Sequence, residues 1–491
     1  RLHGAMAAGP ELPLPFEALW SGALDRLASE DLRTAAAASR QVAAGVAIAV
    51  RRALRPLLPP ASAGAWTPAA GLGWAEVLRR AAEWPRLLIL GGEDAADEPQ
   101  LHVSMVSLSS DGPATHRRLP SDYSLPAGRY RLSVAAVGTA VYVTGGTGPE
   151  GAPCLEVLKM DGLRHRWERG AEAGPAAKGL ARAPTPRYGH ESVCVLGRYL
   201  LCIGGKPTGC MPDGSGNDDF LRLVTDVGGS TDCLDTETGR WLRLPCRLAS
   251  PRAYFGAAVV GSTVVVCGGA ALYTGGSAGA GPPEGRLDST EVLDASELPR
   301  LFEQQDGAAP PASLVWRPGP ELLFPRYDFS LAGPIGGCLF AVGGSGARQL
   351  VEVLDATDLL SRLPPDAGTG RSASAAGRNG SRPSLVPCAA LRRELLSEGW
   401  VDLHLRTRTP QAIGAPAGGV EQPPRWSLHP VEMPDGRSSG NAVAVGRSIW
   451  FVGGSQRTVQ RYTLGDPSWQ PGGTELDSMR FGAGAAVVGN G

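Results

Sequence analysis

The fold of this chain is decided by the stretch Pro186-Arg187-Tyr188-Gly189-His190-Glu191-Ser192-Val193-Cys194-Val195-Leu196-Gly197-Arg198-Tyr199-Leu200-Leu201-Cys202-Ile203-Gly204-Gly205. Two apolar runs, Val193 to Leu196 and Tyr199 to Ile203, flank a Gly-Arg turn, and the second run ends in a diglycine. Apolar, β-branched runs on either side of a short glycine turn predict a β-hairpin. The stretch therefore predicts two antiparallel strands that end at two glycines.

The same apolar run followed by a diglycine recurs along the chain. The first glycines of the six copies are Gly91, Gly145, Gly204, Gly268, Gly343 and Gly453. Successive copies lie 54, 59, 64, 75 and 110 residues apart. A constant core at unequal spacing indicates a repeat architecture in which the strands are constant and the loops vary.

Each copy predicts four strands. In the quoted copy we expect the third strand near Thr231 to Asp235 and the fourth from Trp241, and tryptophan takes the equivalent place elsewhere at Trp167, Trp316, Trp426 and Trp469. Four short strands with glycine and tryptophan at fixed positions are typical of β-propeller blades. From Arg86 to Gly489 these positions resemble kelch repeats, and the resemblance implies an all-β, kelch-type propeller over residues 86–491.

The two ends of the repeat array predict how the propeller closes. The first copy has a second strand, Leu87 to Leu90, with no first strand before it, whereas the last segment, Arg480 to Gly489, is a first strand with no second strand after it. Pairing the two completes a blade and removes open sheet edges. We therefore expect six blades.

The long step of 110 residues is assigned to an insertion within one blade. Val351 to Asp355 predicts a third strand and Arg425 to Leu428 its fourth, which leaves an insertion at 356–424. A degenerate seventh blade around Trp400 to Leu405 is the alternative, although this segment has no diglycine.

The N-terminal part predicts a separate helical module. After a tail at 1–13, residues 14–54 are rich in alanine, and leucines recur at helical spacing. Leu-Pro, Asp-Leu and Ser-Arg at the appropriate distances resemble an F-box, with departures at Ala38 and Val42. By this resemblance the residues that would bind the adaptor of a cullin-based ubiquitin ligase are Leu14, Pro15, Leu19, Leu27 and Leu32. An alanine-rich leader that only packs on its neighbour is the alternative, and 55–85 read as a Pro/Ala-rich linker with one short helix.

Charge and cysteine content restrict the partners and the compartment. The 491 residues carry 47 basic and 48 acidic side chains, so no overall field attracts nucleic acid or an anionic membrane. The nine cysteines form no CxxC pair, which indicates a reducing compartment, the cytoplasm or the nucleus. No apolar run is long enough to span a bilayer. The chain starts at Arg1 without a methionine, so an upstream segment with a targeting signal stays an open alternative.

A repeated arginine is the main candidate for function. It stands 16 or 17 residues before the first glycine of each diglycine after the first, and again where the closing strand starts. Because blades are related by rotation, these positions form a ring around one axis, and guanidinium groups can hold carboxylate or phosphate. Either the ring binds an acidic or phosphorylated partner at the propeller mouth, or each arginine hydrogen-bonds carbonyl groups of an adjacent blade. The six are Arg129, Arg187, Arg252, Arg326, Arg437 and Arg480.

These features predict a binding protein without catalytic residues, cofactor or metal. The F-box and kelch resemblances imply the substrate-recognition subunit of a cullin-based ubiquitin ligase, with the adaptor subunit, the cullin and a target protein as partners. A kelch-repeat interaction scaffold without a ligase role is the first alternative. Propeller enzymes of the sialidase or galactose-oxidase type are the second, although Asp-box repeats and a compact histidine pair are absent from the sequence.

Overall fold

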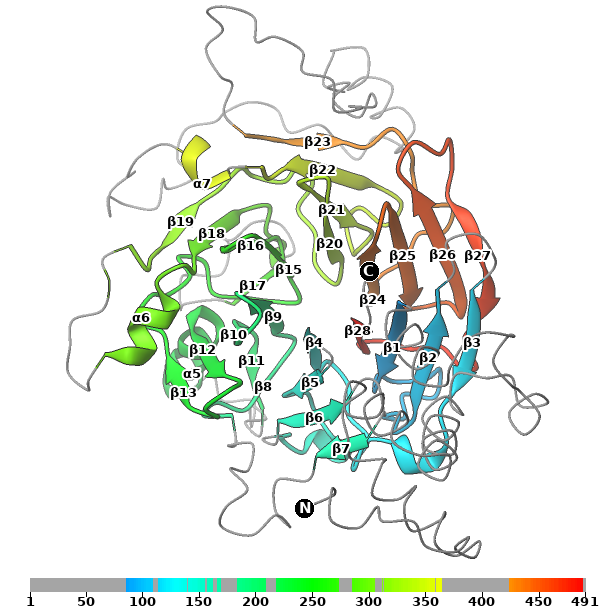
Figure 1. Ribbon diagram of the computed structural model, residues 1–491, viewed down its shortest axis with the longest axis horizontal. Coiled ribbons are helices and arrows are strands. Elements are labelled where there is room, and N and C mark those ends of the chain that lie inside the picture. Colours follow the sequence, from blue (N-terminus) through cyan, green and yellow to red (C-terminus); the bar gives the residue numbers. More distant parts are fainter. Residues whose placement is uncertain are drawn as a thin grey trace, which may run out of the picture.

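The structure is a computed structural model that describes residues 85–108, 114–138, 140–154, 157–161, 166–168, 183–208, 218–272, 285–304, 311, 313–357, 359–363 and 424–488. The predicted tail at 1–13, the F-box-like segment at 14–54 and nearly all of the predicted linker lie outside these residues. The same is true of the alternative seventh blade. The described part is mostly β-structure, with six four-stranded antiparallel sheets arranged around one axis (Figure 1).

Each sheet is one blade, and its strands are given from the axis outward. Blade 1 contains β28 (Gly484–Val488), β1 (Arg86–Leu90), β2 (Val103–Ser107) and β3 (Thr115–Arg118). Blade 2 contains β4 (Ser133–Val137), β5 (Ala140–Thr144), β6 (Leu158–Asp161) and β7 (Arg166–Glu168). Blade 3 contains β9 (Glu191–Val195), β10 (Tyr199–Ile203), β12 (Thr231–Asp235) and β13 (Trp241–Arg243).

The other half of the ring follows the same order. Blade 4 contains β15 (Gly256–Val260), β16 (Thr263–Cys267), β18 (Thr290–Asp294) and β19 (Trp316–Pro318). Blade 5 contains β20 (Ser330–Ile335), β21 (Cys338–Val342), β22 (Val351–Asp355) and β23 (Trp426–Leu428). Blade 6 contains β24 (Gly440–Val445), β25 (Ser448–Gly453), β26 (Thr458–Thr463) and β27 (Gln470–Glu475). The six-bladed propeller predicted from the repeats is confirmed.

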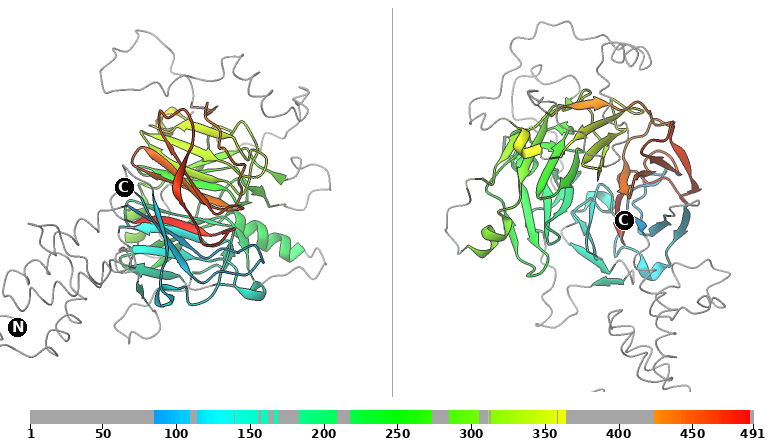
Figure 2. Two further views of the ribbon diagram at one scale, coloured as in Figure 1. Left: turned by 90° about the vertical axis from the view of Figure 1, so that its right-hand side faces the viewer. Right: turned by 45° about the horizontal axis from the view of Figure 1, so that its top comes forward.

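The remaining elements are short and lie in the connections between strands. Two small ladders join β8 (Arg187–Tyr188) to β11 (Lys206–Pro207) and β14 (Arg252–Ala253) to β17 (Ala270–Ala271). The helical elements are η3 (Ser121–Tyr123), η4 (Pro149–Gly151), α5 (Asp218–Gly229), α6 (Leu298–Glu303) and α7 (Leu359–Arg362). In the side view of Figure 2, α5 projects from the body of the propeller. No helix among the described residues has the length and apolar character of a membrane span.

The ring closes between the two ends of the described chain. β1 pairs with β28 over five residues, with Leu88 opposite Ala486 at the centre, as the unpaired ends of the repeat array predict. A second contact lies at the outer rim, where the amide of Ala114 donates to the carbonyl of Gly472 at 2.8 Å. The two ends of the described chain are therefore paired within blade 1, and blade 1 is hydrogen-bonded to blade 6 at the outer rim.

The hairpin quoted from the sequence is confirmed, with a small change at its turn. β9 ends at Val195, one residue earlier than predicted, because the turn contains Leu196, Gly197 and Arg198. Leu196 has φ +54°, a left-handed conformation that costs a branched residue energy, and its side chain is exposed. β10 is buried along its whole length, since neighbouring blades cover both of its faces.

Two short helices brace adjacent blades and were not predicted. The motif Val-Leu-Asp-Ala occurs at 292–295 and again at 353–356, and α6 and α7 follow its two copies. Phe302 of α6 packs on Tyr199 of blade 3, with ring centroids 5.2 Å apart, and Arg240 of blade 3 donates to the Phe302 carbonyl at 3.0 Å. α7 lies within the predicted 356–424 insertion, of which residue 358 and residues 364–423 lie outside the described residues.

Candidate functional site

The six repeated arginines are buried inside the blades. Their residues are between 0% and 3% exposed: Arg129, Arg187, Arg252, Arg326, Arg437 and Arg480. In five of them a guanidinium nitrogen donates to the carbonyl of the first glycine of the diglycine in the same blade; Arg437 donates to the carbonyl of Thr458 instead. The arginines therefore cover the ends of their own second and third strands.

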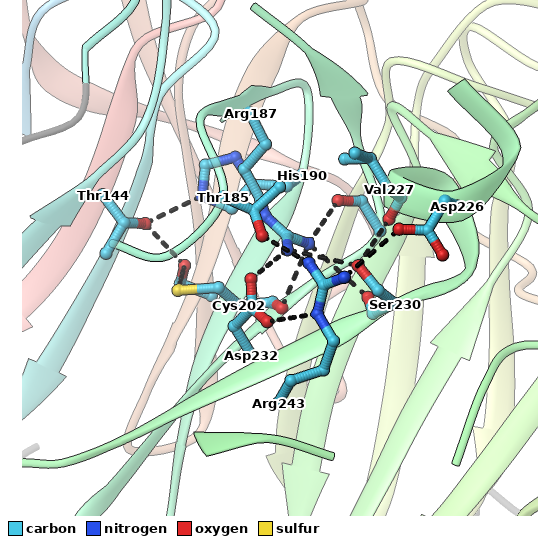
Figure 3. Close-up of polar contacts among 12 residues, drawn as sticks. Thr144, Thr185, Arg187, His190, Cys202, Asp226, Val227, Ser230, Asp232 and Arg243 are labelled. Carbon is cyan, nitrogen blue, oxygen red and sulfur yellow. Dashed lines mark hydrogen bonds and ion pairs between the residues drawn. The ribbon is translucent and has the colours of Figure 1, made fainter. Parts of the chain in front are cut away.

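Blade 3 illustrates the arrangement (Figure 3). Arg187 donates to the Gly204 carbonyl at 2.8 Å and to the Ser230 hydroxyl at 3.2 Å, and it also forms a short ion pair with Asp232. Asp232 also accepts from Nε of Arg243 at 3.0 Å. A buried carboxylate between two arginines thus compensates the buried charge of Arg187.

The carboxylate that pairs with the arginine changes position around the ring. It comes from the third strand in blades 4 and 5, where Glu291 lies 2.7 Å from Arg252 and Glu352 pairs with Arg326. In blades 6 and 1 it comes from the loop just before the arginine: Asp435 lies 3.1 Å from Arg437 and Asp477 lies 3.8 Å from Arg480. Burial nevertheless lowers the pKa of Arg480 to about 10.

The backbone carbonyls of the arginines join each blade to the one before it. In all six cases the amide of the second glycine of a diglycine donates to the carbonyl of the next blade's arginine, at 2.8–2.9 Å. Gly205 shows why glycine is required: it has φ +91°, and a Cβ there would lie 2.7 Å from the Cβ of His190. Each arginine therefore fixes its own blade through its side chain and the preceding blade through its carbonyl.

This geometry agrees with a structural role for the arginines, but the carbonyls that their side chains bind belong to the same blade and not, as predicted, to an adjacent one. Their side chains are buried, and a partner could reach a guanidinium group only after it left its carbonyl and carboxylate acceptors. Direct partner binding by these six residues stays a prediction, and the contacts do not favour it. The five F-box-like candidates, Leu14, Pro15, Leu19, Leu27 and Leu32, lie outside the described residues.

A second ring lies two residues after the arginines and surrounds the propeller axis. Its members all have φ between 52° and 60°: Arg131, Gly189, Tyr254, Asp328, Ser439 and Gly482. The amide of each one donates to the carbonyl of the member in the preceding blade, at 2.7–3.2 Å, and the sixth bond closes the circle. We call this circle the mouth ring. The face of the propeller on which the first strands begin is called the mouth.

The two glycines of the mouth ring make room for the large side chains. A Cβ on Gly189 would lie 2.5 Å from the Cε1 of Tyr254, and a Cβ on Gly482 would lie 3.1 Å from the Cγ of Arg131. Arg131 consequently extends past Gly189 and makes a short hydrogen bond from Nη1 to the hydroxyl of Tyr254. A charged residue and an aromatic residue thereby meet over the centre of the propeller.

Further side chains gather around Tyr254 at the mouth. The ammonium group of Lys206 and the guanidinium carbon of Arg131 each lie 5.0 Å from the centre of its ring, within the range of cation–π attraction. The ring of Tyr188 lies 6.4 Å away. Arg131 is exposed and the others are partly exposed, so a partner can reach this cluster. We call Arg131, Tyr188, Lys206, Tyr254 and Asp328 the mouth cluster.

Burial perturbs the charged groups of the mouth cluster. It raises the pKa of Asp328 and lowers the pKa of Lys206, because both charged forms lose hydration. Arg131 and Lys206 oppose the shift of Asp328 through their positive charges. A partner that supplies a charged or hydrogen-bonding group here would replace hydration that the fold has already removed.

Sequence reasoning found the arginine ring and missed the mouth ring. The six members of the mouth ring share no residue type, and the signal that could have found them is a constant offset of two residues from each repeated arginine. An aromatic residue directly follows four of the six arginines: Tyr130, Tyr188, Tyr327 and Phe481. All four are partly buried, and Tyr188 belongs to the mouth cluster.

Comparisons with known proteins agree with the fold. No protein-family model matches the chain. A stretch of 83 residues, 16% of this chain, is 43% identical to 8% of "Serine/threonine-protein phosphatase BSL2" from Arabidopsis thaliana. Another of 195 residues, 31% of the chain, is 27% identical to 31% of "Kelch-like protein 25" from Xenopus tropicalis.

The chain therefore matches less than a third of the length of these curated relatives. The likeness to a Kelch-like protein, together with the six-bladed arrangement, supports a kelch-type propeller with a protein-interaction role. Among the described residues there is no group of three or more His, Cys, Asp or Glu side chains arranged to hold a metal ion.

Proposed function

We propose that this chain is the substrate-recognition subunit of a cullin-based ubiquitin ligase, and that it binds its target protein at the mouth of the propeller. The observation that carries the binding part is the mouth cluster, in which Arg131 and Lys206 flank the ring of Tyr254. Arginine and tyrosine dominate the binding energy of protein interfaces. Glycines at two of six positions in the mouth ring leave the space that the side chains of Tyr254 and Arg131 occupy.

The charges of the cluster favour a partner segment with a carboxylate or a phosphate. The fork of Arg131 and the ammonium of Lys206 face the same aromatic ring, and an anion between them would gain two charge-assisted hydrogen bonds. Asp328 would add a position for a donor of the partner. The proposed binding site therefore consists of the exposed and partly exposed residues of the mouth cluster, and not of the buried arginine ring at the same end of the propeller.

The ligase part of the proposal rests on the resemblance of residues 14–54 to an F-box. An adaptor bound there would hold the target beside the ligase and raise the effective concentration of the target's lysines. The chain itself would perform no chemistry in a reducing compartment such as the cytoplasm or the nucleus. A kelch scaffold without a ligase role is the second candidate, since every contact described in the structure belongs to the propeller alone.

Affinity purification with matched variants tests both parts separately. Arg131→Ala and Lys206→Ala should reduce recovery of the target by tenfold or more, whereas Arg300→Ala should leave it unchanged. Arg300 is the control because its side chain on α6 is 72% exposed and lies in a connection of the opposite face. Equal recovery by all three variants would refute binding at the mouth.

Polar substitutions at Leu14, Pro15, Leu27 and Leu32 address the ligase part. They should remove the cullin adaptor from the purified complex while the target remains bound. If the unsubstituted chain recovers its target but no adaptor, the scaffold function replaces the ligase function.

A further inference from the structure

Inside the mouth ring, the first strands of the blades enclose a cavity of about 250 Å³. Its lining comes from all six blades and starts one residue beyond the mouth ring, at Leu132 and Ala483. A water molecule occupies roughly 30 Å³ in the liquid, so the cavity has room for an ion with several waters or for a small organic group. The cavity is separate from the mouth cluster, none of whose members lines it.

Glu191 is the ionisable side chain among the described residues that line this cavity. The other lining groups are apolar residues, glycines and neutral polar residues. The hydroxyl of Ser133 donates to Oε2 of Glu191 at 3.5 Å, a long and weak bond. Glu191 is only partly exposed, and a carboxylate in such a place with one weak donor favours a bound proton or a bound cation.

The equivalent side chains in other blades are engaged differently. The hydroxyl of Ser133 accepts the amide of Ser192 at 2.7 Å, and that of Ser330 accepts the amide of Ala442 at 2.8 Å. Asn441 donates to the carbonyl of Ala483 at 2.9 Å. These three tie their blade to the next one. Glu191, at the same offset from its arginine, makes no such bond to blade 4 among the described residues.

The donors and acceptors of the cavity define the class of ligand. Glu191 supplies one negative charge, and the hydroxyls of Ser133 and Ser330 and the amide oxygen of Asn441 supply neutral oxygen acceptors. Hard cations prefer oxygen ligands, and protein calcium sites take six to eight of them, several from carboxylates, whereas this cavity offers one carboxylate. No lysine, arginine or histidine is among the lining residues. We propose that this cavity binds a small monovalent cation, an alkali-metal ion or a primary ammonium group, through Glu191.

Binding of a cation should displace a proton. Burial raises the pKa of Glu191 to about 8, so the empty site is mostly protonated at neutral pH. A bound cation favours the carboxylate, and linkage then requires release of about 0.9 proton per ion at pH 7 and about 0.1 at pH 9. Below pH 7, the apparent affinity for the cation should increase about tenfold for each unit by which the pH is raised.

Calorimetry on the purified chain tests the proposal without any protein partner, so its outcome is independent of the function proposed above. The chain is dialysed into N-methylglucamine chloride and titrated with potassium, sodium or methylammonium chloride in two buffers of different ionisation enthalpy. The expected result is saturable binding with proton release at pH 7. The three salts distinguish an alkali ion from an ammonium group.

Glu191→Gln is the decisive variant, and Glu237→Gln is its control. Glu237 is a surface carboxylate whose side chain is 67% exposed, so its loss should leave the binding isotherm unchanged. Glu191→Gln should abolish saturable binding while its circular-dichroism melt stays cooperative. Equal binding by the two variants, or no saturable binding by the unsubstituted chain, would overturn the proposal. If Glu191→Gln does not fold, the pH dependence of the unsubstituted chain decides, because pH-independent affinity excludes Glu191 as the ligand.

Discussion

Replacing Arg326 by methionine should separate a structural arginine from a partner-binding one. Its guanidinium group donates to the carbonyls of Gly343 at 3.0 Å and Leu350 at 3.1 Å and pairs with Glu352. Methionine fills much of the same volume but leaves all three acceptors without this donor. Removing one partner of a buried ion pair typically costs about 3–5 kcal/mol of folding free energy.

Arg457→Met is the matched control for this substitution. Arg457 pairs with Glu475 at 2.9 Å, and both side chains are more than half exposed. Exposed ion pairs contribute about 0–1 kcal/mol. The free energy of unfolding of both variants is measured by urea denaturation at pH 7.5. An equal, small effect in the two variants would refute the structural role and return Arg326 to the list of candidate binding residues.

The same pair of variants has a characteristic pH dependence. Burial raises the pKa of Glu352, and Arg326 opposes that rise. In Arg326→Met the pKa of Glu352 therefore lies higher still, and the folded variant binds a proton that the unfolded chain releases. A carboxyl with a raised folded pKa gains stability as the pH falls below that value. The deficit of the variant should consequently be smaller at pH 5.5 than at pH 7.5, and a constant deficit would contradict the pairing.

Three further changes test other features of the ring. Gly189→Ala should destabilise the protein by more than the roughly 1–2 kcal/mol that a left-handed non-glycine residue costs, because the added Cβ would meet the ring of Tyr254 at 2.5 Å. The control is Gly138→Ala, where φ is also positive and no atom lies within 4 Å of the added Cβ. In a urea titration this control should cost only that roughly 1–2 kcal/mol. Burial lowers the pKa of His116, so the unfolded chain binds more protons than the folded chain below about pH 6.5. His116→Gln should therefore reduce the loss of folding free energy on acidification. If the free energy of unfolding falls with the same slope in both proteins between pH 7.5 and 5, His116 does not contribute to this loss. Removing residues 480–491 should expose the edge of β1 and cause the chain to elute as aggregates from a sizing column. A monomer with unchanged melting temperature would show that strand closure is dispensable.

The sequence predicted the fold well because the blade repeats itself. The hairpin at 191–203, the six diglycines and the pairing of the two chain ends all follow from local patterns that recur. α6 and α7 were missed, since the motif that precedes them occurs only twice and each helix is held by packing on the preceding blade. Such tertiary support leaves little signal in the helix sequence itself.

The candidate site was only half predictable for a different reason. Equal spacing identifies positions that share an environment, and it selected Arg187 and its equivalents because all six perform the same structural task. Residues of the mouth ring share a backbone conformation instead, and Arg131, Tyr254 and Asp328 differ in chemistry. A site that recognises one partner on a symmetric scaffold must break the symmetry, so repeat analysis is least informative where the partner binds.

The closed circle of backbone hydrogen bonds at the mouth also sets the mechanical character of that surface. All six amides donate in the same rotational direction, so each bond polarises the next and no terminal member exists from which the circle could fray. To open this circle for a ligand, two blades would have to separate. Their separation would also break the hydrogen bond from the second glycine of a diglycine to the carbonyl of the next blade's arginine. The mouth therefore has a fixed circumference, and a partner bound there would be accommodated by rearrangement of the side chains above the ring.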